Sequence, residues 1–345
     1  MRHPASHSAS HHVSRLRLGL LLTVLLVLAA VLPRAMTAQA EAGPCGTASL
    51  SDGQAHAIRH VVWVVFETKT RDTVFADSTV DPYLTTLAGQ CGQATSYESV
   101  PYHAAKLAMT SGTDWGVQGD AASVPGPDLF SQLGTSWTAY MGAMPGNCWT
   151  TDTDLYLARH NPAAYFVDNQ AACATRDLPL PSTPAQLDLS QPFTWIEADV
   201  PDSMHGCPLL CSPTAAGQVA AGDAWASTWI SGLVASPQYL EGDTAIFVVW
   251  DQGTNATTHA NTAFLVISPY TTPGFVSTVP YTHYSLLRGT EDLLGLPPLA
   301  HAGDAGTTSV ADDFGLPYPP VPGATNAGPW TGATLPPVIL PPPNP

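Results

Sequence analysis

The chain has 345 residues, enough for one large domain with a substantial core. Its 11 Lys and Arg residues face 27 Asp and Glu residues, which gives a formal net charge of −16 at pH 7. Nucleic acid is therefore excluded as an expected partner, because its phosphates would be repelled and few cationic side chains could displace its counterions.

The first 40 residues have the pattern of a secretory signal peptide. Basic residues precede the apolar run GLLLTVLLVLAAVL, and the small residues of TAQA end at Ala40. The run is short for a membrane span, so an uncleaved anchor is the weaker alternative. Cleavage removes four Arg and no acid, leaving 7 basic and 27 acidic residues and a net charge of −20. We therefore predict a secreted, extracellular protein with no transmembrane segment in the mature chain.

The clearest predicted strand is HVVWVVF, residues 60–66, which is followed at once by Glu67. A second predicted strand, TAIFVVW, is followed by Asp251, and a third is TAFLVIS. Ligands of open α/β sheets bind beyond the carboxyl ends of the strands. The two acids together therefore predict a site for a divalent metal ion, which prefers such oxygen ligands. Either acid alone would more simply cap the next turn.

Predicted helices alternate with these strands, which favours an α/β fold with a mostly parallel sheet. In AAGQVAAGDAWASTWISGLVAS, the large apolar side chains fall on one helix face, which indicates core packing rather than a ligand site. They are Val219, Trp225, Trp229 and Leu233. A second helix, YSLLRGTEDLLGL, is opened by Thr282 and His283 and closed by Gly295.

The composition changes near the C-terminus, where PYPPVPGATNAGPWTGATLPPVILPPPNP is rich in Pro and Gly. Such a segment cannot build a core of its own. We predict a signal peptide at 1–40, a single domain at 41–316 and a disordered tail at 317–345.

The six cysteines form an even set, for which disulfides are the expected state in an exported chain. From proximity along the chain we predict the pairs Cys45–Cys91, Cys148–Cys173 and Cys207–Cys211. A zinc site is the alternative, but no two of these cysteines have CxxC spacing.

Four histidines lie in loops or at helix starts between the apolar runs: His103, His205, His259 and His283. Each alone fits a structural histidine, but four of them with two strand-end acids fit a hydrolytic site better. Because the chain has few Lys and Arg residues, a site for phosphate would need positive charge from elsewhere. A divalent metal ion is the compact way to supply it.

A more specific pattern runs over residues 60–316. It consists of the segments HVVWVVFETKTRDTVF, PYLTTLAGQCGQATSY, YMGAMPGNC, ARHNPAAYF, GDAWASTWISGLVASPQYLEGDTAIFVVWDQG and LVISPYTTPGFVSTVPYTHYSLLRGTEDLLGLPPL. Together they resemble the secreted bacterial phosphoesterase family, which includes phospholipases C and acid phosphatases. The resemblance implies an alkaline-phosphatase-like α/β fold, with helices flanking a mostly parallel central sheet, a divalent metal and hydrolysis through a hydroxyl nucleophile.

Four residues match functional positions of that family. Glu67 matches the metal-binding Glu of a Glu-Asn motif, and Asp251 matches the first acid of a Trp-Asp-Glu motif. His205, in DSMHGC, matches the histidine of Asn-Asp-Met-His, and His283, in THYSLLR, matches that of Asn-His-Tyr.

Other positions depart from the family pattern. Thr68 stands at the position of the metal-binding Asn, Gln252 at that of the Glu, and Ser203 at that of the Asp in the Met-His motif. The stretch that brings the hydroxyl nucleophile to a helix start appears here as PYHAAKLAMTSG, two residues shorter, with Tyr102 and His103 at the matching place. The resemblance therefore leaves the nucleophile unassigned.

Two mechanisms remain open from the sequence. A water bound to the divalent metal could attack phosphorus, with His103 or His205 as acid or base. Alternatively, a histidine could form the covalent intermediate. The predicted catalytic residues are His103, His205 and His283, and the predicted metal ligands are Glu67, Asp251 and Thr68.

The sequence thus predicts a hydrolase of the phosphatase or phospholipase C type, acting on a phosphate-ester small molecule or a phospholipid head group. One alternative is a non-catalytic family member that keeps the fold and binds a ligand or partner. A third interpretation is a structural protein associated with the cell envelope through the tail.

Overall fold

The computed structural model describes residues 43–48, 57–100, 105–117, 124–253 and 260–318. The predicted signal peptide, nearly all of the predicted tail, and the residues His103 and His259 lie outside these ranges.

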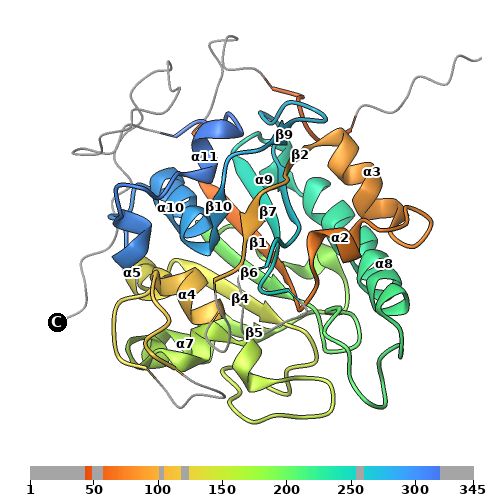
Figure 1. Cartoon of the computed structure of the whole chain (residues 1–345). Coiled ribbons are helices and arrows are strands. Elements are labelled where there is room, and N and C mark those ends of the chain that lie inside the picture. Colours follow the sequence, from red (N-terminus) through yellow and green to blue (C-terminus); the bar gives the residue numbers. More distant parts are fainter. Residues whose placement is uncertain (1–42, 49–56, 101–104, 118–123, 254–259, 319–345) are drawn as a thin grey trace, which may run out of the picture. The chain divides into compact units, whose positions relative to one another are not determined.

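The fold is built on an eight-stranded sheet with the order β5-β4-β6-β1-β7-β8-β2-β9 (Figure 1). Its strands are β1 (His60–Phe66), β2 (Gly92–Ala94), β4 (Trp137–Met141), β5 (Asp177–Pro179), β6 (Phe193–Glu197), β7 (Thr244–Trp250), β8 (Phe264–Ile267) and β9 (Val276–Ser277). Strands β5, β4, β6, β1 and β7 are all parallel, whereas β8 runs antiparallel to both of its neighbours. A separate pair joins β3 (Tyr97–Glu98) to β10 (Tyr281–Thr282). The predicted α/β class with a mostly parallel central sheet is confirmed.

Helices pack on both sides of this sheet. They are α2 (Arg71–Val74), α3 (Pro82–Gln90), α4 (Ala105–Ser111), α5 (Leu129–Leu133), α6 (Pro162–Tyr165), α7 (Gln170–Arg176), α8 (Ala215–Val234), α9 (Pro237–Leu240), α10 (His283–Leu294) and α11 (Val310–Asp313), with short 3-10 turns η2 (Ala158–His160), η3 (Val167–Asn169), η4 (Pro184–Gln186) and η5 (Ala300–Gly303). The two long predicted helices are α8 and α10, and all four residues of the predicted α8 stripe are buried. Helix α10 begins after the Thr282 cap and ends at Gly295, which adopts the left-handed φ of 68° that glycine tolerates.

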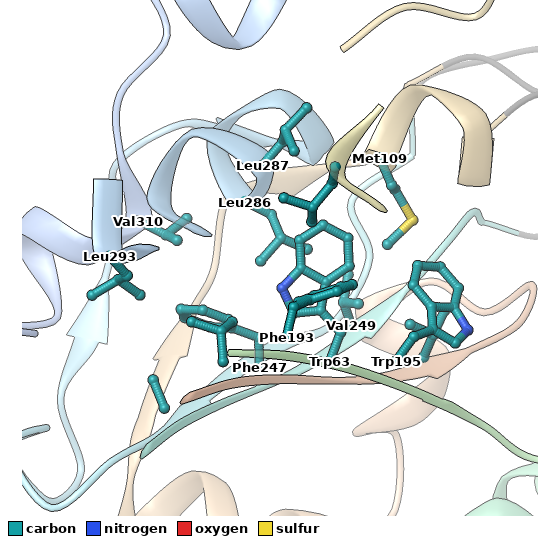
Figure 2. Packing of buried hydrophobic residues seen from close by; sticks show 14 of the residues in the cluster. Trp63, Met109, Phe193, Trp195, Phe247, Val249, Leu286, Leu287, Leu293 and Val310 are labelled. Atoms are coloured by element: carbon teal, nitrogen blue, oxygen red, sulfur yellow. The ribbon is translucent and has the colours of Figure 1, made fainter. Parts of the chain in front are cut away.

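Successive residues of β1 point to opposite faces of the sheet, and each face has its own core. On one face Trp63 packs at the edge of Phe193 and donates a hydrogen bond to Thr290 in α10. Figure 2 shows α10 and α4 side chains, including Leu286 and Met109, over this face. On the other face Phe66 packs against Trp225 of α8. Because β1 is covered on both faces, whatever follows Phe66 is held at a fixed position.

All three predicted disulfides are present: Cys45–Cys91, Cys148–Cys173 and Cys207–Cys211. Buried residues continue for two positions past residue 316, since Pro317 and Tyr318 are both buried. Among the described residues, no helix has the length and apolar character needed to cross a membrane.

Candidate active site

Three acids stand at the ends of three adjacent parallel strands. Glu67 follows β1, Asp251 follows β7, and Glu197 is the last residue of β6. Strands β6 and β7 pair with β1 on its two sides, so the three carboxyl groups meet at one edge of the sheet. All three side chains are buried. The structure thus brings the two predicted metal ligands Glu67 and Asp251 to the same edge of the sheet.

The ammonium group of Lys106, from the first turn of α4, lies among these acids. Its Nζ contacts Glu67 Oε1 and lies 3.0 Å from Asp251 Oδ2 and 3.3 Å from Glu197 Oε1. The Lys106 side chain is only 6% exposed. A single buried cation therefore bridges the ends of three strands.

The protonation states of this group follow from burial and from the Lys106 charge. Burial alone would raise the pKa of Glu67, but His160 and Lys106 lower it well below its usual range. Burial lowers the pKa of His160 well below its usual range, so Lys106 is the partner that stays charged at neutral pH. Burial raises the pKa of Glu197 well above its usual range, and burial and Glu67 raise that of Asp251 to about 6. At neutral pH Glu67 is thus ionised, Asp251 is mostly ionised, and Glu197 keeps its proton.

Two histidines complete the group. His160 Nδ1, from η2, lies 3.2 Å from Glu67 Oε1 and 3.3 Å from Glu197 Oε1. His205 Nδ1 lies 3.4 Å from Glu67 Oε2, and the two imidazole rings are 5.4 Å apart. His160 is buried, whereas the His205 side chain is 26% exposed and gives the group an opening to solvent. We refer to Glu67, Lys106, His160, Glu197, His205 and Asp251 as the strand-end cluster.

Thr68 lies at the rim of the strand-end cluster in an unusual backbone conformation. Its φ is +34°, which a β-branched residue rarely adopts. The backbone N–H donates to Asp251 Oδ1 at 3.2 Å, and the hydroxyl accepts a hydrogen bond from Gln252 Nε2 at 3.0 Å. The hydroxyl also lies 3.4 Å from His205 Nδ1. These contacts account for the constrained turn that follows β1.

Of the other predicted catalytic residues, the structure describes only His283, which reaches the strand-end cluster through the backbone of Asp251. His283 is buried, with Nδ1 at 2.9 Å from the Tyr97 hydroxyl and Nε2 at 2.5 Å from the backbone oxygen of Asp251. It therefore positions Asp251 through the main chain. The Ser203 hydroxyl accepts a hydrogen bond from the backbone N–H of His205. The Ser203 backbone oxygen accepts one from the backbone N–H of Glu67, so Ser203 joins the His205 loop to the end of β1.

Three members of the strand-end cluster were not predicted. Glu197 ends FTWIE, a short buried strand, so it is an acid at a strand end like Glu67 and Asp251. His160 lies in ARHNPAAYF, and Lys106 lies in the stretch where a hydroxyl nucleophile was sought. The chain has only two lysines, Lys69 and Lys106, and both are buried beside the cluster.

Candidate metal-ligand groups are present at two places among the described residues. Ligand atoms of Glu67, His160 and His205 lie within 4.8 Å of one another, as do those of Cys148, Cys173 and Asp177. The second set has no thiolate to offer, because its sulfur atoms form a disulfide. Between Glu67 and Asp251, where the sequence predicted a divalent ion, the ammonium of Lys106 contacts both carboxylates. With Lys106 there, these residues do not fit a divalent metal.

Comparison with known proteins gives one match to a protein family. The model of the Phosphoesterase family matches residues 111–297. No curated protein sequence matches the chain.

Several solved structures are similar to part of this chain at low sequence identity. A protein in the alkaline phosphatase superfamily from Vibrio parahaemolyticus is 11% identical, with a TM-score of 0.46, over 76% of this chain and 73% of that one. The phosphonate monoester hydrolase of Silicibacter pomeroyi is 12% identical, with a TM-score of 0.45, over 74% and 76%. Murine ectonucleotide pyrophosphatase / phosphodiesterase 5 is 10% identical, with a TM-score of 0.47, over 72% and 98%. At this level of similarity we draw nothing about activity from them.

Proposed function

Since the chain belongs to the Phosphoesterase family, we propose that it hydrolyses a phosphate ester at the strand-end cluster. The observation that carries the proposal is the pairing of His205 with Glu67, 3.4 Å apart, at the opening of an otherwise buried group of acids. An imidazole oriented by a carboxylate is suited to proton transfer near neutral pH.

We assign His205 the role of general base. With Nδ1–H directed at the ionised Glu67, Nε2 is left to accept a proton. It takes that proton from a water molecule whose oxygen attacks phosphorus. The phosphorus–oxygen bond to the leaving group breaks, its electron pair stays on the leaving oxygen, and the imidazolium returns the proton to that oxygen. Glu67 stabilises the imidazolium while it carries the proton.

Two buried cations make the mouth of the site less repulsive to a phosphate. Lys106 offsets the charge of Glu67, and the Lys69 ammonium donates to the backbone oxygens of Met204 and Thr68, beside His205. Because Glu197 retains its proton, the cluster carries less negative charge than its three acids would otherwise give it. We propose small phosphomonoesters or phospholipid head groups as the substrate class.

The test is turnover of a chromogenic phosphomonoester and a chromogenic phosphodiester by the parent chain and by His205→Gln. Loss of the base should lower kcat/KM by about 100-fold or more. His301→Gln is the matched control, because His301 is 57% exposed and pairs with Asp304 outside the cluster. Equal turnover by the parent and His205→Gln would remove His205 from the mechanism.

A second candidate function is binding of a phosphate ester without turnover. It is favoured by Lys106, which neutralises the acids internally and takes the place that the resemblance gives to a metal. Saturable binding of the phosphomonoester, measured by calorimetry, with no product formed over hours would establish this alternative.

We also propose that the protein acts outside the cell. The three disulfides support this, since such bonds persist in oxidising compartments. Recovery of the processed chain in the medium, beginning near Glu41, would test both export and the cleavage site.

A further inference from the structure

We propose that the ammonium of Lys106 is the resident cation of the strand-end cluster, and that the cluster is a latent divalent-cation site that opens only when this lysine is removed. The inference concerns ion binding and does not depend on whether the chain turns over a substrate.

The geometry shows why one cation excludes the other. An ammonium group has three hydrogens to donate, and Lys106 Nζ faces one oxygen from each of Glu67, Glu197 and Asp251. A divalent ion bridging these strand ends would need the same oxygens at about 2.0–2.6 Å. Both cations cannot hold these positions at once.

The lysine is not free to swing away. Every residue of α4 is buried, and Met109 of the same helix packs in the core on the α10 face of the sheet (Figure 2). Thr110 donates a hydrogen bond to the backbone oxygen of Lys106 at 2.8 Å. An ion could displace the ammonium only by driving a charged side chain into this core, which is costly.

The carboxyl oxygens of Glu197 give a separate indication that the cluster could bind an ion. It is fully buried, yet neither carboxyl oxygen forms a hydrogen bond within the part of the chain that the structure describes. Such groups are rare in folded proteins and call for an explanation. Lys106 Nζ lies 3.3 Å from Oε1 but leaves the second oxygen unused. A divalent ion could use both.

The experiment compares three chains that have been freed of metal with a chelator: the parent, Lys106→Ala and Lys106→Met. Each is titrated calorimetrically with Mg²⁺, Ca²⁺, Mn²⁺ and Zn²⁺. Lys106→Ala removes the charge and opens space, so it should bind one ion per chain at least about 100-fold more tightly than the parent, because the freed carboxylates are the ligands that such ions prefer. Lys106→Met removes the charge but fills the space and should bind at least about 10-fold more weakly than Lys106→Ala.

Folding is followed in the same samples, because a chain stabilised by an ion melts at a higher temperature when the ion is present. If Lys106→Ala does not fold without an ion but folds with one, the proposal is supported. If Lys106→Ala folds in neither condition, a double variant replaces it in the titration. This variant carries Lys106→Ala and Glu197→Gln and so has one acid fewer.

Two results would overturn the proposal. One is a parent chain that binds one divalent ion per chain and loses it on Asp251→Asn. The other is a folded Lys106→Ala chain, or a folded double variant with Lys106→Ala and Glu197→Gln, that binds none of the four ions.

Discussion

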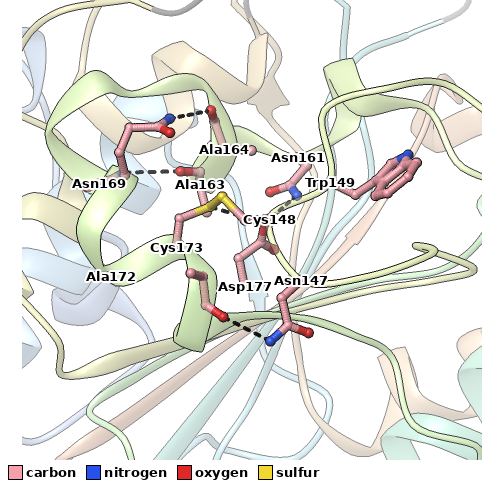
Figure 3. Close-up of a disulfide and its surroundings, with 12 residues drawn as sticks. Asn147, Cys148, Trp149, Asn161, Ala163, Ala164, Asn169, Ala172, Cys173 and Asp177 are labelled. Carbon is pink, nitrogen blue, oxygen red and sulfur yellow. Dashed lines mark hydrogen bonds between the residues drawn. A yellow bond between two sulfur atoms is a disulfide. The ribbon is translucent and has the colours of Figure 1, made fainter.

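Two regions of this molecule bring together largely buried side chains of the kind that bind metals, and they neutralise their acids in different ways. In the strand-end cluster, Glu67 and Asp251 contact the ammonium of Lys106. In the second region, Asp177 lies beside the Cys148–Cys173 disulfide and accepts a hydrogen bond from Asn161 Nδ2 at 2.7 Å (Figure 3). No residue that the structure describes forms an ion pair with Asp177, and burial raises its pKa to about 7.

The difference shows what a buried carboxyl group needs in order to remain in a core. It must either meet a cation that keeps it ionised or retain its proton, because an isolated buried charge is too costly. The first solution produces a polarised group that can orient an imidazole for proton transfer. The second produces a neutral, structural group. Only the first region is therefore suited to chemistry.

The largest effect that separates the two regions is expected from Lys106→Met. The substitution keeps most of the side-chain volume but leaves Glu67 and Asp251 without their cation, and breaking a buried ion pair in this way costs about 3–5 kcal/mol. Chemical denaturation at pH 7 in metal-free buffer measures it. The cost should be smaller at pH 5, because Asp251, with a pKa of about 6, is then mostly protonated.

Lys69→Met is the matched control for this prediction. The Lys69 ammonium is also buried but donates to backbone oxygens rather than to carboxylates. Its loss should cost about 1–3 kcal/mol, the penalty of unsatisfied neutral acceptors. If the two lysine variants lose equal stability at both pH values, Lys106 does not stabilise the fold through its pairing with Glu67 and Asp251.

The second region should depend on its covalent bond instead. Replacing both Cys148 and Cys173 by Ser removes a covalent bond between residues that are 25 positions apart in the sequence. This change should lower the free energy of unfolding by about 3 kcal/mol. Turnover by the folded fraction should stay unchanged, because neither cysteine belongs to the strand-end cluster. Denaturation and activity of the same preparation check the two statements, and a lost activity in a folded chain would contradict the separation of the regions.

The sequence predicted the first region only in part. Strands β1 and β7 were predicted to the residue, because a long, mostly apolar run followed directly by an acid is a strong local pattern. The three disulfides were also predicted correctly from short sequence separations. Glu197 also stands at a strand end, but only four strand residues precede it, against seven for Glu67 and Asp251. A short strand gives a weaker pattern.

Lys106 and His160 could not be placed by pattern, for a physical reason. Their positions depend on how α4 and η2 pack over the sheet, and residues far apart in sequence meet there. The pattern did contain one indication, since Lys106 lies in an otherwise small and apolar helix, AKLAMTS, where a charge is costly unless it has a partner. The family resemblance implies a hydroxyl nucleophile in this stretch, and it gives no role to a lysine there.

Asp177→Asn should have a smaller effect that depends on pH. The folded-state pKa of about 7 lies above the usual value near 3.9, so the stability that the protonated carboxyl contributes is complete below about pH 4 and is lost as pH rises through 7. Asn resembles the protonated form at every pH and can still accept from Asn161. We therefore expect the variant to match the parent at pH 4 and to be the more stable of the two chains at pH 8.

Denaturation at the two pH values tests this, and the difference between parent and variant cancels the other titrating acids. Asp168→Asn, an exposed acid in the same segment, should change stability by less than about 0.5 kcal/mol at either pH. An Asp177→Asn chain that is less stable than the parent at pH 8 would show that this carboxyl is ionised and paired.

The smallest effect is expected where an ion pair reaches the surface. Arg59 donates through Nε and Nη2 to Asp243 Oδ2, at 3.1 Å and 2.9 Å, but the Arg59 side chain is 60% exposed. Water can replace its guanidinium, so Arg59→Ala should cost only about 0.2–1 kcal/mol. Salt screens exposed pairs and hardly reaches buried ones. Raising the salt concentration to about 1 M should therefore shrink the difference in stability between the parent and Arg59→Ala. It should leave the difference between the parent and Lys106→Met nearly unchanged.

The control is Arg59→Lys, which keeps the charge and should have a stability between those of the parent and Arg59→Ala at low salt. If Arg59→Ala proves as costly as Lys106→Met, or if both differences respond equally to salt, burial is not what gives Lys106 its effect.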